Sequence, residues 1–147
     1  MAIADRSVTT VWEGDLATGT GTFRDSSSGA LDAQQVTWGS RTEAPGGKSS
    51  PEELAAAAHS ACFSMALALN LAENSTPPTA LDVTSMVSLD EVDGRPTITT
   101  SAITVKAVVD GIDEETFQKV ISDTAELCPV SRLFAGAKIT VDATLSR

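Results

Sequence analysis

Cys62 and Cys128 are the only two cysteines in the chain, and each stands in a distinctive helical context. Cys62 lies within a long, nearly uncharged run that begins at Pro51. Cys128 is followed directly by Pro129, which ends one helix and can open another, because proline lacks an amide donor and fits the first helical position. If the fold brings the two sulfurs together, the chain can perform dithiol redox chemistry.

The local sequence favours Cys128 as the more reactive thiol. The segment Pro129–Phe134 presents free amides toward it, and the amino-terminal end of a helix lowers the pKa of a thiol. Cys62 lies in the middle of its helix, where a buried core thiol is an equally good interpretation. Because burial raises the pKa of a thiol, Cys62 needs a nearby cation to react.

His59 precedes Cys62 by three residues on the same helical face. With Cys128 it could form a zinc site that keeps one open position. It could also act as a base for Cys62, although side chains at this spacing rarely align for proton transfer. A satisfied core histidine is the interpretation we favour. The sequence contains no phosphate-binding loop, dinucleotide fingerprint or carboxylate-rich metal motif.

The composition predicts a single acidic globular domain, residues 1–147. The net charge of −10 disfavours nucleic acid and anionic membranes as partners. The segment Met1–Arg6 has no apolar signal core, so we expect a cytoplasmic protein. In that compartment a persistent structural disulfide is rare and a transient catalytic one is plausible.

Strand patterns surround two helices. Short strands are predicted near residues 7–12, 20–23 and 34–38, followed by a loop over 41–48. Alternating apolar residues predict strands over 81–89 and 139–145, and a turn at 93–96 leads into a strand over 97–109. We expect a bulge between Ala102 and Ile103, where the inward face changes. This order predicts an α+β fold with a mostly antiparallel sheet.

The first predicted helix runs from Pro51 to about Glu73 and carries Cys62. A capping box between Ser50 and Glu53 opens it. The stretch 55–72 is long enough to raise the question of a membrane span, but polar residues interrupt it and its alanines make it weakly hydrophobic. We therefore expect a buried central helix. Because no charge occurs between Glu53 and Glu73, a partner subunit is the simplest source of cover for its remaining faces.

The second predicted helix begins after Asp113 as N-cap and carries Cys128 at its end. Ile112 and Phe117 are placed for a hydrophobic staple. One apolar stripe leads along this helix to Cys128, so we expect that sulfur to face the core. The stripe consists of Phe117, Val120, Ile121, Thr124 and Cys128.

Residues 50–66, SPEELAAAAHSACFSMA, closely resemble the signature helix of the OsmC/Ohr family, and of its OsmC (osmotically inducible protein C) branch in particular. The resemblance extends over nearly the whole chain. Its further matches are Trp12–Asp15, Val87–Asp90, Gly111–Asp113, Cys128–Ser131 and the terminal strand.

This resemblance implies an OsmC-like fold, in which β-sheets wrap around the central helix of an intertwined homodimer. It implies a cysteine-based peroxidase that reduces organic hydroperoxides in oxidative stress defence, without metal or flavin. By the same resemblance Cys62 is the peroxidatic sulfur, Cys128 the resolving sulfur and Glu52 the acidic site residue. Arg41 is the OsmC-like match for the catalytic arginine. Weaker candidates for it are Arg6, Arg24 and Arg132.

In the implied mechanism Arg41 stabilises the Cys62 thiolate, and Glu52 holds the guanidinium through a bidentate pair. The sulfenic acid formed on Cys62 condenses with Cys128 to a disulfide, which a dithiol reductant must reopen. Lipoyl-type dithiols and thioredoxin are the reductants to compare. Two alternatives stay open: a zinc site on His59, Cys62 and Cys128, and a dimer that binds a hydrophobic ligand without peroxidase activity.

Helix geometry adds an expectation about the dimer. Glu52 and Cys62 are ten residues apart on one helix, hence about 15 Å apart along its axis and about 80° apart in direction. Glu52 cannot orient a group at its own chain's Cys62 unless Arg41 spans that gap. Two such helices packed antiparallel would bring Glu52 of one near Cys62 of the other. We therefore expect Arg41 and Glu52 to act in trans, with close approach permitted by Ala55, Ala58 and Ala61.

Overall fold

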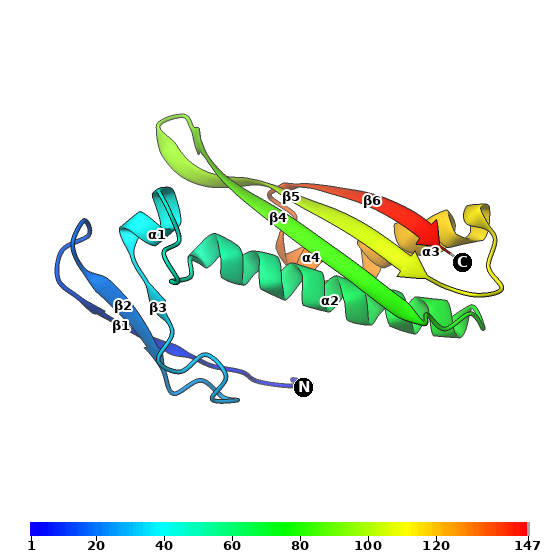
Figure 1. Cartoon of the computed structure of the whole chain (residues 1–147), viewed down its shortest axis with the longest axis horizontal. Helices are drawn as coiled ribbons and strands as arrows, with labels where there is room; N and C mark the ends of the chain where they lie inside the picture. Colours follow the sequence, from blue (N-terminus) through cyan, green and yellow to red (C-terminus); the bar gives the residue numbers. More distant parts are fainter. Residues whose placement is uncertain (147) are drawn as a thin grey trace. The chain divides into compact units, whose positions relative to one another are not determined.

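The computed structural model describes residues 1–146, which form two compact units divided between Leu54 and Ala55. A single domain over residues 1–147 stays a prediction. Figure 1 labels the elements: β1 (Thr9–Glu13), β2 (Thr20–Arg24), β3 (Gln35–Val36), α1 (Trp38–Thr42), α2 (Pro51–Glu73), β4 (Ala80–Val92), β5 (Arg95–Val108), α3 (Glu114–Leu127), α4 (Pro129–Leu133) and β6 (Lys138–Ser146).

The first unit contains a three-stranded antiparallel sheet in the order β1-β2-β3. Asp15 holds the turn between β1 and β2: its carboxylate accepts from the Thr18 amide at 2.8 Å, and its carbonyl accepts from the Gly19 amide at 2.8 Å. A Cβ on Gly19 would lie 2.3 Å from that carbonyl, so the turn requires glycine.

The end of the third strand differs from the prediction. The strand stops at Val36, and the short helix α1 occupies residues predicted as strand end and loop. Thr37 is its N-cap, with the Thr37 hydroxyl accepting from the Ser40 amide at 3.0 Å and the Ser40 hydroxyl accepting from the Thr37 amide at 2.9 Å. One helical turn is too short to show periodicity, so only this capping pair could have revealed α1.

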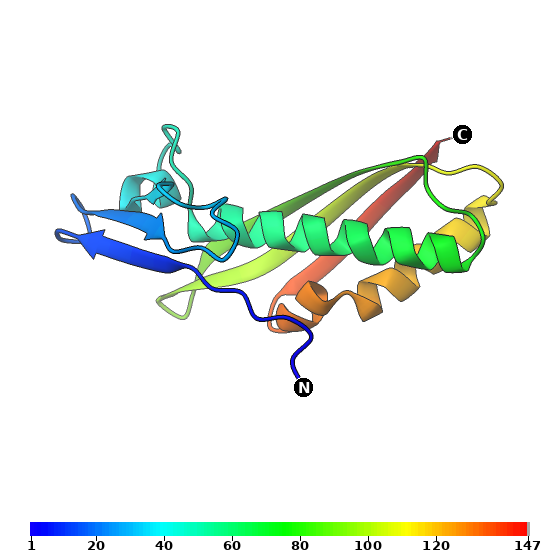
Figure 2. The same ribbon diagram turned by 90° about the horizontal axis from the view of Figure 1, so that it is seen from below.

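The second unit contains a three-stranded sheet in the order β4-β5-β6. β4 and β5 pair antiparallel, whereas β5 and β6 pair parallel because the chain crosses over through α3 and α4. Figures 1 and 2 show α2 and α3 on the same face of this sheet. The α+β prediction is confirmed, with one parallel pair in a mostly antiparallel fold.

The core of the second unit lies between the sheet and these two helices. Asp113 caps α3 as predicted, accepting from the Thr116 amide at 2.8 Å. The predicted stripe on α3 is buried along its length. The buried cluster consists of Phe63, Leu67, Leu71, Ile103, Val105, Ala107, Val109, Ile112, Phe117, Val120, Ile121 and Cys128.

The bulge predicted between Ala102 and Ile103 is wrong in position. The register shifts at Ser88 and Leu89, which pair with Thr100 and Ile98 and leave one extra residue between them on β5. Beyond that point the buried positions alternate without a break from Ser101 to Val109. Ser101 faces the core, where its hydroxyl is hydrogen-bonded to His59 and Ser85. The predicted bulge is wrong because a polar residue is not expected on the inward face.

Helix α2 spans Pro51–Glu73, as predicted. The Glu53 amide donates to the Ser50 hydroxyl at 3.1 Å, and the Glu53 carboxylate accepts from the Ser49 hydroxyl at 2.6 Å. The Ser50 half of the predicted capping box is therefore present, and the Glu53 side chain uses the preceding serine.

Helix α2 has one buried and one exposed apolar face. His59, Phe63 and Leu67 are buried, whereas Met65 is 73% exposed and Leu69 59% exposed. Among the described residues α2 is the helix long and apolar enough to cross a membrane by length and composition, a test that core helices of soluble proteins also pass. In this structure its buried face packs on protein.

Candidate active site

The structure brings the two sulfurs together. Cys62 lies in the middle of α2 and is half-buried, and Cys128 is fully buried at the junction of α3 and α4. Both are free thiols; Cys62 packs against the buried cluster that contains Cys128, and each thiol shifts the pKa of the other. Two sulfurs in contact can form a disulfide with little movement of the backbone.

The two thiols differ in acidity. Burial raises the pKa of Cys62, the Val130 amide offsets part of this, and the contact with Cys128 raises it further. Burial also opposes ionisation of Cys128, but the Ser131 hydroxyl and amide, the Cys62 thiol and the Val130 amide together lower its pKa. Cys128 is therefore the more acidic thiol of the second unit, as its place at a helix start predicts.

Cys128 is the N-cap of α4, and its side chain makes no capping hydrogen bond. Pro129 occupies the first helical position and Ser131 the third. Side chains at the N-cap and the third position approach each other in a helix start. This geometry places the Ser131 hydroxyl beside the Cys128 sulfur.

His59 is fully buried and uses both ring nitrogens. Its Nδ1 lies 2.6 Å from the Ser101 hydroxyl, and its Nε2 lies 2.8 Å from the Ser131 hydroxyl. Ser101 continues the chain to Ser85, with 3.0 Å between their hydroxyl oxygens. The Phe134 ring packs edge-on against the imidazole, with 5.2 Å between ring centroids. The prediction of a satisfied core histidine agrees with this geometry.

The same geometry bears on the zinc alternative. Both ring nitrogens of His59 are occupied by serine hydroxyls, so neither is left for a metal. In the part of the chain that the structure describes, no three histidine, cysteine, aspartate or glutamate side chains form a metal-binding group. Burial lowers the pKa of His59, so the ring is neutral at neutral pH.

Arg41 and Glu52 form a bidentate pair in the first unit. The guanidinium Nε lies 3.0 and 3.1 Å from the two carboxylate oxygens, and Nη2 lies 2.7 Å from Oε1. The side chains are 29% and 11% exposed, so water screens the pair weakly. The pair leaves the Nη1 group free to bind another acceptor.

Two short connections fix this pair. Arg41 lies on α1, and Glu52 lies in the first turn of α2. The Ser40 hydroxyl donates to the Ser49 carbonyl at 2.8 Å, and Val36 forms a β-bridge with Ser49. These contacts tie α1 and the end of β3 to the residues that precede α2, so the cation and the carboxylate are held together locally.

The weaker arginine candidates have other surroundings. Arg24 pairs with Asp25 at 3.5 Å on the surface, and Arg6 donates to the Asp5 carbonyl at 2.7 Å. Arg132 is exposed on α4. Arg41, in contrast, is oriented by a buried carboxylate, which distinguishes it from these three.

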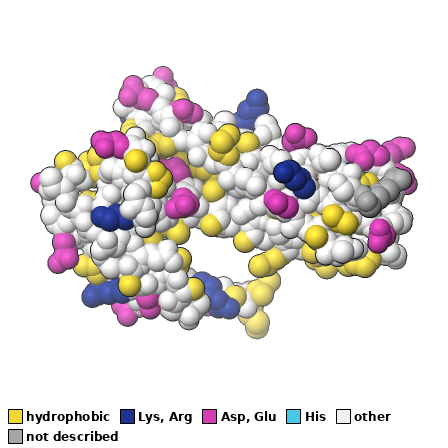
Figure 3. Space-filling view, viewed as in Figure 1, with side chains coloured by type: hydrophobic (Ala, Val, Ile, Leu, Met, Phe, Trp, Pro, Cys, Tyr) yellow, Lys and Arg dark blue, Asp and Glu magenta, His cyan; other side chains and the backbone are white. Residues whose placement is uncertain are grey.

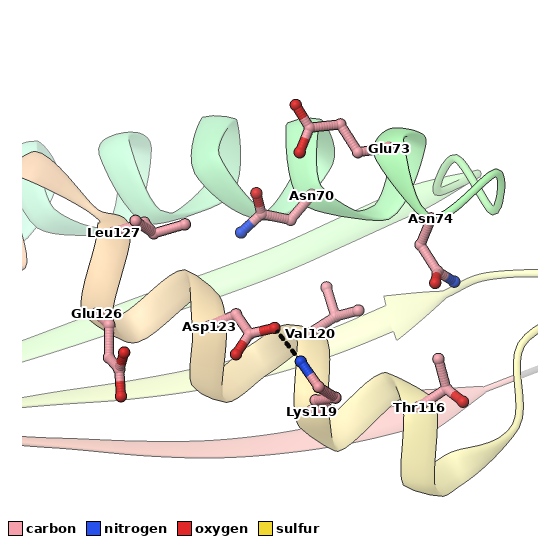
Figure 4. Close-up of a pocket in the computed structure, with 9 residues that line it drawn as sticks. All are labelled: Asn70, Glu73, Asn74, Thr116, Lys119, Val120, Asp123, Glu126 and Leu127. Carbon is pink, nitrogen blue, oxygen red and sulfur yellow. Dashed lines mark hydrogen bonds and ion pairs between the residues drawn. The ribbon is translucent and has the colours of Figure 1, made fainter.

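A hollow of about 500 Å³ between α2 and α3 is a separate feature (Figure 4). Its lining mixes charged, amide and apolar side chains, with Lys119 paired to Asp123 at 2.7 Å. Asn70 lies at its α2 side and donates to the Thr124 hydroxyl at 2.9 Å. Leu127 lines it, but the sulfurs do not, so this hollow is not the redox centre.

The three serines of the network around His59 are not predicted from the sequence. Ser131 has a signal, because it stands three residues after Cys128 in a helix start. Ser85 and Ser101 interrupt strands that are otherwise apolar on the inward face, but their partners become visible only when the sheet meets α2.

Comparison with known proteins decides the family. Residues 44–144 match the model of the family described as OsmC-like protein. The chain is 45% identical to Peroxiredoxin OsmC of Escherichia coli (strain K12) over 134 residues, which is 91% of this chain and 92% of that protein. The chain belongs to the OsmC family.

Solved structures agree with this OsmC-family fold. The organic hydroperoxide resistance protein OhrB of Bacillus subtilis is 28% identical, with a TM-score of 0.70 over 99% of this chain and 100% of that one. An OsmC-like protein from Mycoplasma pneumoniae has a TM-score of 0.72 over 99% of this chain and 100% of its own, at 17% identity, and shows the fold alone. With its two sulfurs in contact, this OsmC-family chain is a cysteine-based peroxidase.

Proposed function

We propose that this protein reduces organic hydroperoxides to alcohols, with Cys62 as peroxidatic and Cys128 as resolving cysteine. The observation that carries the proposal is the contact between the only two thiols of the chain. The name of the similar Bacillus subtilis protein, an organic hydroperoxide resistance protein, supports the substrate class.

The reaction divides into three balanced steps. The Cys62 thiolate attacks the distal peroxide oxygen, the O–O bond breaks, and the alkoxide leaves and takes up a proton to give the alcohol. The Cys62 sulfenic acid then reacts with the Cys128 thiolate, forming the S–S bond and releasing hydroxide. A dithiol reductant, for which lipoyl-type dithiols are one candidate, is oxidised as it returns both cysteines to thiols.

Arg41 is proposed as the cation that Cys62 needs. Burial raises the pKa of Cys62, so its thiolate requires a positive partner. Arg41 supplies a guanidinium whose Nη1 group is not used in the pair with Glu52. Glu52 acts as a positioning residue that fixes the guanidinium plane.

We propose further that the protein works as a homodimer with shared sites. The exposed face of α2 carries Met65 and Leu69 beside small residues such as Ala61, and a second copy of the chain would cover it. Arg41 and Glu52 of one chain would then serve Cys62 of the other. The two cysteines, held as free thiols, suit the cytoplasm.

Peroxide consumption by the two single-cysteine variants tests the proposal. Cys62→Ser should abolish consumption of cumene hydroperoxide in stopped-flow measurements. Cys128→Ser should still react once and then accumulate sulfenic or sulfinic acid on Cys62, as seen by mass spectrometry. If Cys128→Ser alone blocks the first attack, the roles of the cysteines are reversed. If the wild-type protein consumes no hydroperoxide, the proposal fails.

A further inference from the structure

The buried histidine belongs to a continuous chain of polar groups that ends at a sulfur. Ser85, Ser101, His59 and Ser131 follow one another at 3.0, 2.6 and 2.8 Å, crossing from β4 through β5 and α2 to α4. Ser131 then stands beside the Cys128 sulfur as the third residue of the helix that Cys128 caps. The peroxidase chemistry described above assigns no task to this chain.

A neutral imidazole has one donor and one acceptor nitrogen, so the hydrogen bonds of this chain can all point toward Cys128 or all point away from it. If Nδ1 carries the proton, Nε2 accepts from the Ser131 hydroxyl, whose only hydrogen then points away from the sulfur. If Nε2 carries the proton, it donates to the Ser131 oxygen, and the Ser131 hydrogen is free for Cys128. Ser101 then donates to Nδ1 and accepts from Ser85.

The two ends of the chain favour the second direction. At one end lies a sulfur that accepts when it is a thiolate. At the other end, Ser85 has a hydroxyl hydrogen that it can give to Ser101. The Ser101 and Ser131 hydroxyls then each donate and accept, Nδ1 accepts and Nε2 donates, which is the satisfied arrangement that a buried network needs.

We propose that His59 is a positioning residue for Cys128: its Nε2–H donates to the Ser131 hydroxyl and so directs that hydroxyl's hydrogen to the Cys128 sulfur. The inference rests on the proposed function, in which Cys128 must be a thiolate to attack the Cys62 sulfenic acid. The chain Ser85–Ser101–His59–Ser131 thus prepares the resolving step.

The single histidine of the sequence gives a direct test of direction. In the full-length protein without an affinity tag, two-bond proton–nitrogen NMR spectra report which ring nitrogen of His59 carries the proton. We expect a neutral ring protonated at Nε2 in the reduced protein. A ring protonated at Nδ1, or a charged ring at neutral pH, would overturn the inference.

Alanine variants test whether the hydrogen-bond chain from Ser85 to Ser131 acts on the Cys128 sulfur. In the Cys62→Ser background, where Cys128 is the sole thiol, Ser131→Ala should raise the pKa of Cys128 by about one unit, measured by the pH dependence of alkylation. Ser101→Ala removes the donor to Nδ1, so the ring can reverse and draw the Ser131 hydrogen away. Ser101→Ala should therefore also raise the pKa of Cys128, although the hydrogen-bond partners of Ser101 are His59 and Ser85 and not a sulfur.

The controls separate positioning from structure. Ser122→Ala, an exposed change on α3, should leave the pKa of Cys128 unchanged. Ser131→Thr keeps a hydroxyl and should restore the low pKa. If the pKa of Cys128 is unchanged in a folded Ser101→Ala protein, the inference that this hydrogen-bond chain acts as a relay to Cys128 is refuted. If that variant does not fold, Ser131→Ala and the ring protonation still decide.

A kinetic signature follows in the otherwise wild-type protein. Two titratable groups on α2 face this region: Cys62 faces Cys128, and His59 faces Ser131. The charged side chains that flank Cys128 and Ser131 in sequence, Glu126 and Arg132, are exposed. At a pH below the pKa of Cys128, the Ser131→Ala variant has about a tenfold smaller fraction of Cys128 thiolate, but each thiolate is more nucleophilic.

Conversion of the sulfenic acid to disulfide should therefore slow by about threefold at low pH and become faster than wild type at high pH. Parallel pH profiles would contradict the inference. If no sulfenic acid forms at all, the proposed function fails, whereas the NMR and alkylation results still test the relay.

Discussion

At the scale of single residues, the surroundings of the two thiols shift their pKa values in opposite directions. The polar groups of Ser131 and Val130 and the Cys62 thiol lower the pKa of Cys128, whereas burial raises the pKa of Cys62. A thiolate ready at Cys128 suits the resolving role, because the sulfenic acid on Cys62 is converted before a second peroxide can attack it. The acidity of Cys128 and the proposed role of Cys62 are therefore compatible.

His59 also makes stability depend on pH. Because burial lowers its pKa, the unfolded chain takes up a proton on this ring more readily than the folded chain. Its contribution is fully present above the ordinary pKa near 6.5 and is lost as the pH falls below it. We expect the free energy of unfolding by urea to fall between pH 7.5 and pH 5.5, and to fall less in His59→Gln. Equal slopes in both proteins would contradict this.

At the scale of elements, the sequence predicted what local chemistry determines. The limits of α2, the cap at Asp113 and the buried stripe on α3 follow from patterns within each segment. The parallel pairing of β6 and the inward turn of Ser101 depend on contacts between distant segments, which a single sequence does not reveal. The contact of the two thiols is of the same kind, and only the family resemblance anticipated it.

Helix α1 gives a prediction at this scale. Thr37→Ala removes the hydroxyl that accepts from the Ser40 amide and should cost about 1 kcal/mol of local stability. Amide exchange at Ser40 and Arg41 should accelerate, and peroxide reduction should slow because the Arg41–Glu52 pair loosens. Thr37→Ser keeps the cap and serves as the control. Unchanged exchange in Thr37→Ala would mean that the contact of Ser40 with Ser49 suffices.

At the scale of the whole molecule, charge and assembly limit the partners. On the face seen in Figure 3, acidic side chains are spread over both units and basic ones occur singly. With a net charge of −10, such a surface repels nucleic acid and favours neutral or cationic ligands. An uncharged organic hydroperoxide meets no such barrier.

The proposed sharing of sites between two subunits predicts complementation between defective chains. Glu52→Ala and Cys62→Ser homodimers should both be poorly active. Their heterodimer should recover one working site, because Arg41 and Glu52 of the Cys62→Ser chain serve the intact Cys62 of the other. Native mass spectrometry confirms that heterodimers form. Heterodimers without recovered activity would show that each site is built within one chain.

The separation of the two cysteines on α2 and at the start of α4 has a consequence during synthesis. Cys62 leaves the ribosome 66 residues before Cys128, an interval of about 3–13 s at ordinary translation rates. In that time Cys62 has no second thiol of its own chain, so an oxidised nascent sulfur depends on small-molecule thiols or proceeds to the irreversible sulfinic acid. Under peroxide stress, permanent damage should therefore concentrate in newly made molecules, while mature ones keep turning over.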